Sequence, residues 1–344
     1  MISNLEEYFE QIERLTRRAD WKSAEALAKL LSISDSHAKE RSLHLEEYGS
    51  KTRRERVSDV EFDELTCLHL HVLHSIHVTH NMVAAHSTQV QMIQTFNKEV
   101  LKKRKDENWF LPVFYQISTD LRLLAKEADA VAAQDDEGES AVSFFETSAN
   151  CLMESFRTCV TERAESRDTK RVAILNMTNQ LFRIYFKINK LNLLTPLIRT
   201  IENSESMFHE FSMADKVTYY YFLGRKAMFD ANLNLAEKSL SYAFRNCPVE
   251  CKSNKRRILV YLIPVKMFLG HMPSRALLHK YELDEFQEVV EAVKEGNLDQ
   301  LDRALSKNEK FFIQCGIFLM LEKLRLITFR TLFKKVSLEV THFS

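Results

Sequence analysis

Residues 181–193 read LFRIYFKINKLNL, and residues 223–235 read LGRKAMFDANLNL. Both segments begin with leucine, carry arginine at the third position and end in the triplet LNL, and they lie 42 positions apart. Each combines an apolar helical pattern with a polar turn, so the recurrence predicts two copies of one helix pair. A unit of this size buries its apolar face only by stacking on neighbouring units.

Two further helix pairs are predicted after these copies, and they match in pattern rather than in sequence. Each has an apolar helix, a turn that contains glycine and a second helix. Their predicted spans are 258–269 with 275–279 around Gly270 and Pro273, and 283–293 with 298–305 around Gly296 and Asn297. A surface built from stacked helix pairs is suited to holding protein partners.

The residues before the repeats are also predicted to be helical. Helical patterns cover 5–31, 62–100, 144–163 and 171–188, and the clearest amphipathic helix begins near Pro112. In that helix apolar residues recur at steps of three and four, at Phe114, Ile117, Leu121, Leu124 and Ala128. The polar stretch 32–59 is predicted to be a linker, and the acidic stretch 134–140 an exposed loop.

Composition supports an all-α fold. Glycine accounts for 6 of the 344 residues, whereas an average protein contains roughly 7% glycine. Folds with phosphate-binding glycine loops or many strand turns need more of it. The 45% hydrophobic content is sufficient for a large core. Six scattered cysteines in a long chain favour reduced thiols in the cytosol or nucleus.

Charge patterning excludes a global attraction to nucleic acid or membrane. The chain has 48 basic and 48 acidic residues, so any such partner must be met by a local patch. The longest apolar stretches, 258–269 and 311–321, are shorter than the roughly 20 residues of a spanning helix. No membrane insertion is therefore predicted, and the N-terminal residues lack the pattern of a signal peptide.

No enzymatic activity and no cofactor are predicted. The short signatures of serine hydrolases, phosphate-binding loops, dinucleotide-binding turns and zinc metalloproteases are all absent. One metal hypothesis remains open, because Cys67, His71 and His74 would share one face of a helix. A polar helix face is the favoured interpretation of these histidines, so no metal site is assigned. Elemental analysis would decide between the two.

Basic residues form two clusters. Eight basic residues and one acidic residue lie between Arg245 and Lys280, and five basic residues lie between Lys323 and Lys335. Such local charge binds phosphate backbones or acidic peptides, although basic residues also coat ordinary solvated helices. The candidate contacts with nucleic acid or an acidic partner are Lys252, Lys255, Arg256, Arg257, Lys334 and Lys335.

Several segments resemble the PCI family of helical scaffold subunits. The residues that carry the resemblance are GRKAMFD at 224–230, NKRRILVYLIPVKMFLGHMP at 254–273, EGNL at 295–298 and FFIQCGIFLMLEKL at 311–324. Members of this family occur in the proteasome lid, the signalosome, a translation initiation factor and an mRNA-export complex. The sequences of residues 179–191 and 107–112 are most similar to the export-complex member.

The resemblance implies an all-α protein, a right-handed stack of helix pairs (a TPR-like solenoid) that leads into a winged helix. The implied domains are a variable N-terminal helical segment and linker at 1–60, an N-terminal helical domain at 61–165 and a PCI helical-repeat domain at 166–344. Residues 328–336 match the opening of the winged helix, and the remainder of that element is expected to be cut short after 336.

The resemblance also implies partners and location. The expected role is a non-enzymatic scaffold subunit of a nuclear mRNA-export complex at the nuclear pore, with some of the protein in the cytoplasm. Its expected partners are the large scaffold subunit, a small acidic subunit of the proteasome-lid type, and RNA or DNA. The alternative is a scaffold in a lid-like or signalosome assembly. With a shortened winged helix, an isolated chain would expose Phe318, Leu321, Ile327 and Phe329 and would be prone to aggregate.

Overall fold

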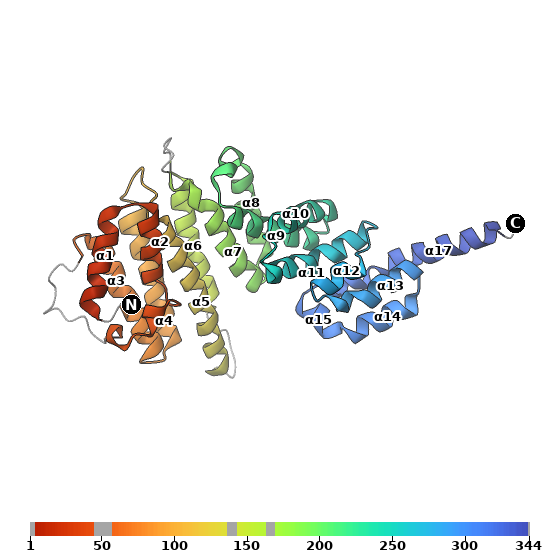
Figure 1. Ribbon diagram of the computed structural model, residues 1–344, viewed down its shortest axis with the longest axis horizontal. Helices are drawn as coiled ribbons and strands as arrows, with labels where there is room; N and C mark the ends of the chain where they lie inside the picture. Colours follow the sequence, from red (N-terminus) through yellow and green to blue (C-terminus); the bar gives the residue numbers. More distant parts are fainter. Residues whose placement is uncertain (1–3, 45–56, 136–142, 163–168, 343–344) are drawn as a thin grey trace. The chain divides into compact units, whose positions relative to one another are not determined.

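The computed structural model describes residues 4–44, 57–135, 143–162 and 169–342, and Figure 1 shows them as a ribbon. All regular structure within these ranges is helical, and no strand occurs there. The chain divides into two compact units, Met1–Phe211 and Ser212–Ser344. The predicted all-α fold of stacked helix pairs is thus confirmed, whereas the three-part domain division stays a prediction.

The first unit contains eight α-helices joined by short helical turns within its described residues. They are α1 (Leu5–Arg18), α2 (Trp21–Leu30), α3 (Val60–His77), α4 (Met82–Thr95), α5 (Leu111–Asp135), α6 (Phe144–Val160), α7 (Ile174–Lys187) and α8 (Leu194–Glu202). The shorter turns are η1 (Ser36–Lys39), η2 (Arg41–Leu43), η4 (Phe96–Leu101), η5 (Lys170–Ala173), η6 (Leu191–Leu193) and η7 (Glu205–Glu210). Consecutive helices pack side by side, α3 on α4 and α4 on α5 among them.

The amphipathic helix predicted near Pro112 is α5, and its apolar positions form the centre of the first unit. Phe114, Ile117, Leu121, Leu124 and Ala128 are all buried, as the spacing predicts. The first two residues of the acidic loop predicted at 134–140 belong to α5, which continues to Asp135. The rest of that loop, like residues 45–56 of the predicted linker, lies outside the described residues.

Two helical patterns predicted as single stretches are helix hairpins. The 5–31 pattern divides at Ala19 and the 62–100 pattern divides at His80, and both residues have left-handed backbone angles (φ 47° and 53°). The next residue caps the following helix in each case, since the Asp20 side chain accepts from Ser23 N and the Asn81 side chain accepts from Ala84 N. These breaks need neither glycine nor proline.

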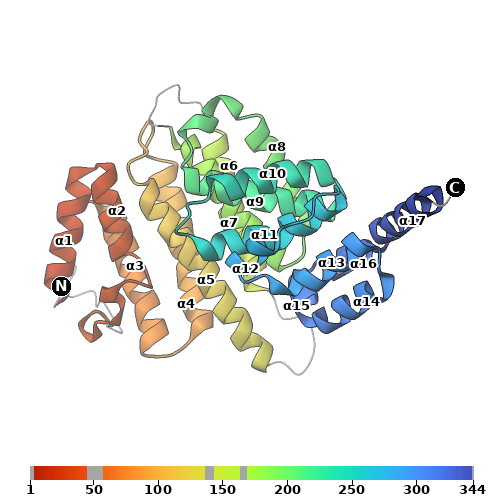
Figure 2. The same cartoon turned by 45° about the vertical axis from the view of Figure 1, so that its right-hand side comes forward.

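The second unit is itself a succession of helix pairs, which the turned view in Figure 2 shows. Its helices are α9 (Met213–Phe229), α10 (Leu233–Asn246), α11 (Lys252–Phe268), α12 (Arg275–Lys280), α13 (Gln287–Glu295), α14 (Leu298–Lys307), α15 (Glu309–Gln314), α16 (Phe318–Glu322) and α17 (Arg325–His342), with the turn η8 (Asp284–Phe286) before α13. Residues 328–336, matched above to the opening of a winged helix, lie within the single helix α17.

One turn geometry recurs through the second unit. The turns after α9, α11, α12, α13 and α15 each contain a residue with left-handed φ, and the next N–H donates to the carbonyl five residues before it, over 2.8–3.0 Å. This bond closes the end of a helix by satisfying a carbonyl that has no partner within the helix. The left-handed residues are Ala231, Gly270, Glu282, Gly296 and Gly316.

The two copies quoted at the outset share this turn but diverge after it. Asn189 and Ala231 occupy matching positions and both are left-handed. In the second copy the Asn232 side chain accepts from Leu235 N at 3.2 Å, so the LNL triplet begins α10. The first copy has Lys190 there, which has no acceptor. Its LNL triplet forms the turn η6, and α8 begins one residue after it.

Two glycines of the second unit lie where helices approach closely. A β-carbon added at Gly224 would lie 2.5 Å from Leu240 Cγ, so α9 and α10 meet at this point. A β-carbon at Gly296 would lie 2.7 Å from the Leu332 backbone nitrogen, and Gly296 is also left-handed. The second contact holds α17 against the turn between α13 and α14.

The core of the second unit runs through all of its helix pairs. Its largest fully buried side chains include Phe286 and Phe312, packed with Leu240, Val265 and Leu321. The burial of Leu321 corrects the expectation that it would be exposed near the end of the chain; Phe329, by contrast, is exposed as expected. None of the described helices is long and apolar enough to cross a membrane.

Candidate partner-binding surfaces

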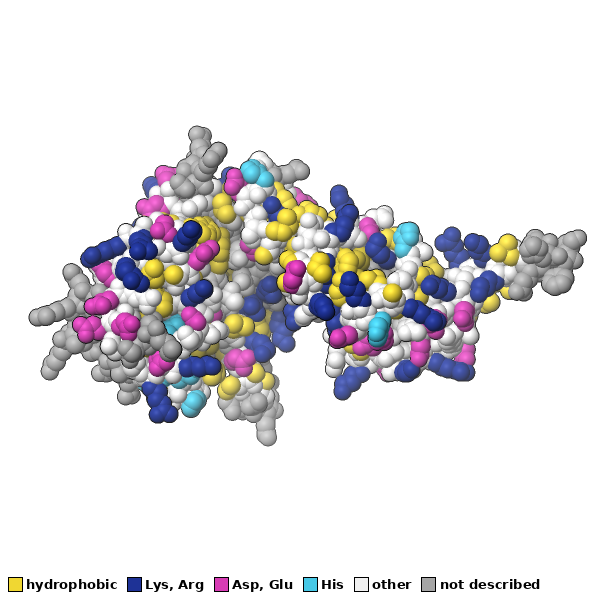
Figure 3. All heavy atoms as spheres, viewed as in Figure 1, with side chains coloured by type: hydrophobic (Ala, Val, Ile, Leu, Met, Phe, Trp, Pro, Cys, Tyr) yellow, Lys and Arg dark blue, Asp and Glu magenta, His cyan; other side chains and the backbone are white. Residues whose placement is uncertain are grey.

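The structure places the predicted basic residues of 252–257 in the first turns of α11, with unequal access to solvent. Lys252 and Arg257 are exposed. Neither side chain forms a hydrogen bond or an ion pair with another described residue. Figure 3 shows that Lys and Arg side chains are distributed over the surface of the second unit. Lys252 and Arg257 are hereafter called the α11 cations, and they remain available to an anionic partner.

Lys255 is the one predicted contact that the structure corrects. Its side chain is buried, and its ammonium group donates to the Phe244 carbonyl over 2.7 Å and lies 4.4 Å from the centre of the Phe244 ring. A buried ammonium group needs such partners, because leaving water without them is costly. Lys255 therefore joins α11 to α10 and is not a surface contact.

Arg256 has an intermediate position. Its guanidinium donates two hydrogen bonds to the Glu282 carbonyl, at 3.2 and 3.1 Å, and lies 3.8 Å from the Glu285 carboxylate. It also stacks over the Phe311 ring. These contacts link α11 to the turn before α13.

The C-terminal pair of predicted contacts lies on the exposed part of α17, which extends past α13 and α14 in Figures 1 and 2. Lys334 is exposed, and its ammonium group forms no hydrogen bond or ion pair with another described residue. Lys335 is exposed as well, but its ammonium group donates to the Glu295 carbonyl at the end of α13 over 3.1 Å. The structure does not place either residue beside the α11 cations in a single patch.

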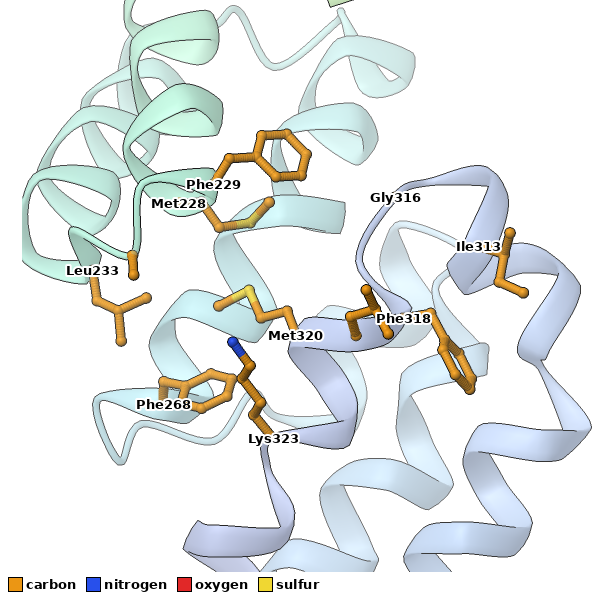
Figure 4. A pocket seen from close by; sticks show the side chains of 11 residues that line it. Met228, Phe229, Leu233, Phe268, Ile313, Gly316, Phe318, Met320 and Lys323 are labelled. Carbon is orange, nitrogen blue, oxygen red and sulfur yellow. The ribbon is translucent and has the colours of Figure 1, made fainter. Parts of the chain in front are cut away.

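An apolar pocket in the second unit was not predicted from the sequence. It has a volume of about 540 Å³ and is formed where the turn after α9, the end of α11 and the α15–α16 turn meet. Figure 4 shows side chains from these three segments around it. Its lining is Met228, Phe229, Ala231, Leu233, Phe268, Ile313, Gly316, Phe318, Leu319, Met320 and Lys323.

A comparison of the two sequence copies contains a signal for this pocket. Phe229 in the second copy is 44% exposed, and the matching position in the first copy is Lys187. A lysine at this place in the first repeat indicates that the repeat itself does not require an apolar residue there. The difference between the two copies at this position therefore identifies Phe229 as a candidate surface residue.

Two histidines of α3 take part in packing. His69 is buried, and its Nε2 lies 3.2 Å from Nε2 of His37. Burial lowers the pKa of His69 well below its usual value, and the adjacent His37 adds to this effect. His77 stacks on His44. Within the described ranges, no group of three or more His, Cys, Asp and Glu residues is arranged to hold a metal ion.

Comparison with known proteins gives near full-length matches. A PCI domain-containing protein 2 homolog of Caenorhabditis elegans is 65% identical over 98% of this chain and 82% of the relative. PCI domain-containing protein 2 of Danio rerio is 42% identical over 96% of this chain and 81% of the relative. Enhanced ethylene response protein 5 of Arabidopsis thaliana is 32% identical over 95% of this chain and 78% of the relative. No family model matches the chain.

Proposed function

Because the chain belongs to the family of PCI domain-containing protein 2, and is thus a PCI scaffold subunit, we propose that it serves in a nuclear mRNA-export complex at the nuclear pore. In this role it docks a large scaffold subunit and a small acidic subunit without catalysing a reaction. RNA or DNA is a further candidate partner. Part of the protein resides in the cytoplasm.

The observation that carries this proposal is the pair of α11 cations on a stack of helix pairs. Stacked pairs expose long helix faces to partners. Lys252 and Arg257 are exposed near the N-terminus of α11 and have no recorded ion pair among the described residues. An acidic peptide or a phosphate backbone would supply the missing negative charge. The similarity of 179–191 and 107–112 to the export-complex member of the family supports that complex over other PCI assemblies.

The first test is assembly. The chain is co-expressed with the large scaffold subunit and the small acidic subunit of the export complex, and the mass of the product is measured by size exclusion with light scattering. A stable ternary complex is the expected result. The chain could instead fail to bind these subunits and co-purify with subunits of the proteasome lid or the signalosome. That result would assign it to the corresponding assembly.

The second test is charge reversal of the α11 cations. Lys252→Glu with Arg257→Glu should weaken binding of the small acidic subunit by about tenfold, because each exposed charge pair contributes at most about 1 kcal/mol. The difference should shrink as salt screens the charges. Affinity is measured by isothermal titration calorimetry at two salt concentrations.

The matched control reverses two exposed lysines elsewhere in the second unit, Lys238→Glu with Lys310→Glu. Both double variants change the net charge equally. Unchanged affinity in the control, together with weaker binding after reversal of the α11 cations, locates the contact on α11. Equal losses in both would mean that only the overall charge matters. Lys255 is left intact, because its reversal would bury a carboxylate beside the Phe244 carbonyl.

A further inference from the structure

Several large apolar side chains in the wall of the pocket are exposed to solvent. Ile313 is 55% exposed and Leu319 is 72% exposed, and both line the pocket together with the partly exposed Phe229. Soluble proteins seldom keep neighbouring large apolar side chains in water unless the surface binds something. The pocket is therefore a candidate binding site in its own right, and α11 contributes to it with Phe268 at the opposite end from the α11 cations.

Lys323 gives this pocket a charge preference. It is the one charged residue among the described residues that line the pocket, it is exposed, and its ammonium group forms no hydrogen bond or ion pair with another described residue. Figure 4 shows its amino nitrogen beside Met320 and Phe268. This ammonium group would attract a carboxylate at the edge of the pocket.

The open shape of the site favours a peptide over a small molecule. A small ligand gains affinity when a pocket covers most of its surface, but here much of the Leu319 and Ile313 side chains faces outward. A peptide can insert one side chain into the pocket and cover these walls with the residues on either side. Aromatic and large aliphatic anchors of this kind dominate protein interfaces.

We propose that the pocket binds an acidic peptide segment of a partner protein, with an apolar side chain inside it and a neighbouring carboxylate paired to Lys323. This inference rests on the proposed scaffold function and adds a second docking point to it. The left-handed turn at Ala231 presents Phe229 and Leu233 to the pocket from one side, and the left-handed turn at Gly316 carries the opposite wall. The same turn geometry that builds the helix stack thus shapes the site.

The probe is a random dodecapeptide library displayed on phage and selected against the full chain. Enriched peptides are synthesised with a fluorescein label, and their affinity is measured by fluorescence anisotropy. We expect them to combine Trp, Phe or Leu with adjacent Asp or Glu. Phe229→Lys, which installs the residue of the first repeat, should weaken binding by about tenfold or more, whereas Phe229→Leu should retain most of it.

Lys323 is tested by exchanging charges. Lys323→Glu should weaken binding of the acidic peptide, and a peptide with lysine in place of its acidic residues should recover affinity for that variant. Leu235→Lys is the matched control, because Leu235 is an exposed apolar residue of α10 outside the pocket; its affinity should equal that of the parent. Thermal unfolding of each variant verifies that the fold is intact.

The inference is overturned if no peptide is enriched, if enriched peptides lack acidic residues, or if Phe229→Lys leaves affinity unchanged. These failures are distinguishable from failure of the proposed function, because peptide binding uses the isolated chain. If the ternary complex forms normally but no peptide is selected, only the peptide-binding role of the pocket is contradicted. If peptides are selected but no ternary complex forms, the peptide-binding role of the pocket stands and the role in the export complex is contradicted.

Discussion

Gly224 shows how one residue sets the distance between two helices. A methyl group at this position would overlap Leu240 Cγ, which belongs to the side-chain stem and cannot move aside freely. Gly224→Ala gains helix propensity of up to about 1 kcal/mol, but overpacking costs about 1–3 kcal/mol. We expect a net loss of about 1 kcal/mol in the free energy of unfolding, measured by urea denaturation.

A double-mutant cycle separates the contact from the propensity. Leu240→Ala alone should destabilise the chain, because it leaves a cavity. In that background Gly224→Ala has no side-chain stem to meet and should become neutral or stabilising. The same penalty in both backgrounds would show that Leu240 is not the obstacle.

His86 gives the first unit a pH dependence of known sign. Its Nε2 lies 2.8 Å from the Ser148 hydroxyl, and its ring packs edge-on against Phe144, so it joins α4 to α6. Burial lowers the pKa of His86 from 6.5 to about 4, although the Asp129 charge partly opposes the shift. Between these values the unfolded chain binds the extra proton, so stability falls as pH decreases from about 6.5 to about 4, on the order of 3 kcal/mol.

The expected result is that His86→Gln reduces the loss of stability on acidification. Glutamine places an amide near the position of Nε2 but does not titrate in this range. Stability is measured by urea denaturation of both proteins at several pH values. Parent and variant must be compared because Asp120 titrates in the same pH range. Burial raises the pKa of Asp120 to about 7, so its contribution to stability increases as the pH falls. Parallel pH profiles for parent and variant would contradict the assignment to His86.

At the scale of the element, the asparagine after a left-handed residue decides where the next helix begins. Asn232→Ala should cost about 1 kcal/mol, because Leu235 N loses the side-chain acceptor that caps α10. Thermal unfolding followed by circular dichroism measures the loss. Asn234→Ala, an exposed asparagine inside the same helix, is the control. If both variants lost the same stability, the cap would not be the cause.

Two helix pairs of the second unit could be predicted closely because their breaks fall at glycine. Gly270 and Gly296 lie where the turns were expected, and α11 to α14 follow from them. The hairpins at Ala19 and His80 could not be separated in the same way. Their left-handed residues are ordinary L-amino acids, and the remaining signal is a single Asp or Asn cap.

At the scale of the whole molecule, the formal net charge is zero, so charged partners must be bound by local surface patches. The basic clusters were visible in the sequence, but their roles were not. Lys255 and Arg256 lie among exposed cations, yet tertiary contacts to Phe244 and Glu282 use them internally. The pocket is less predictable still, because its walls come from three segments that only the folded chain brings together.

The close approach of Gly296 to Leu332 has a consequence for how this protein can vary. Any side chain at 296 would need both a left-handed backbone and a shift of α17 away from the α13–α14 turn. Such a shift would carry Lys334 with it and break the bond from Lys335 to the Glu295 carbonyl. The direction of α17 therefore depends on glycine at position 296. A substitution at this position is tolerable only when position 332 and its neighbours change at the same time.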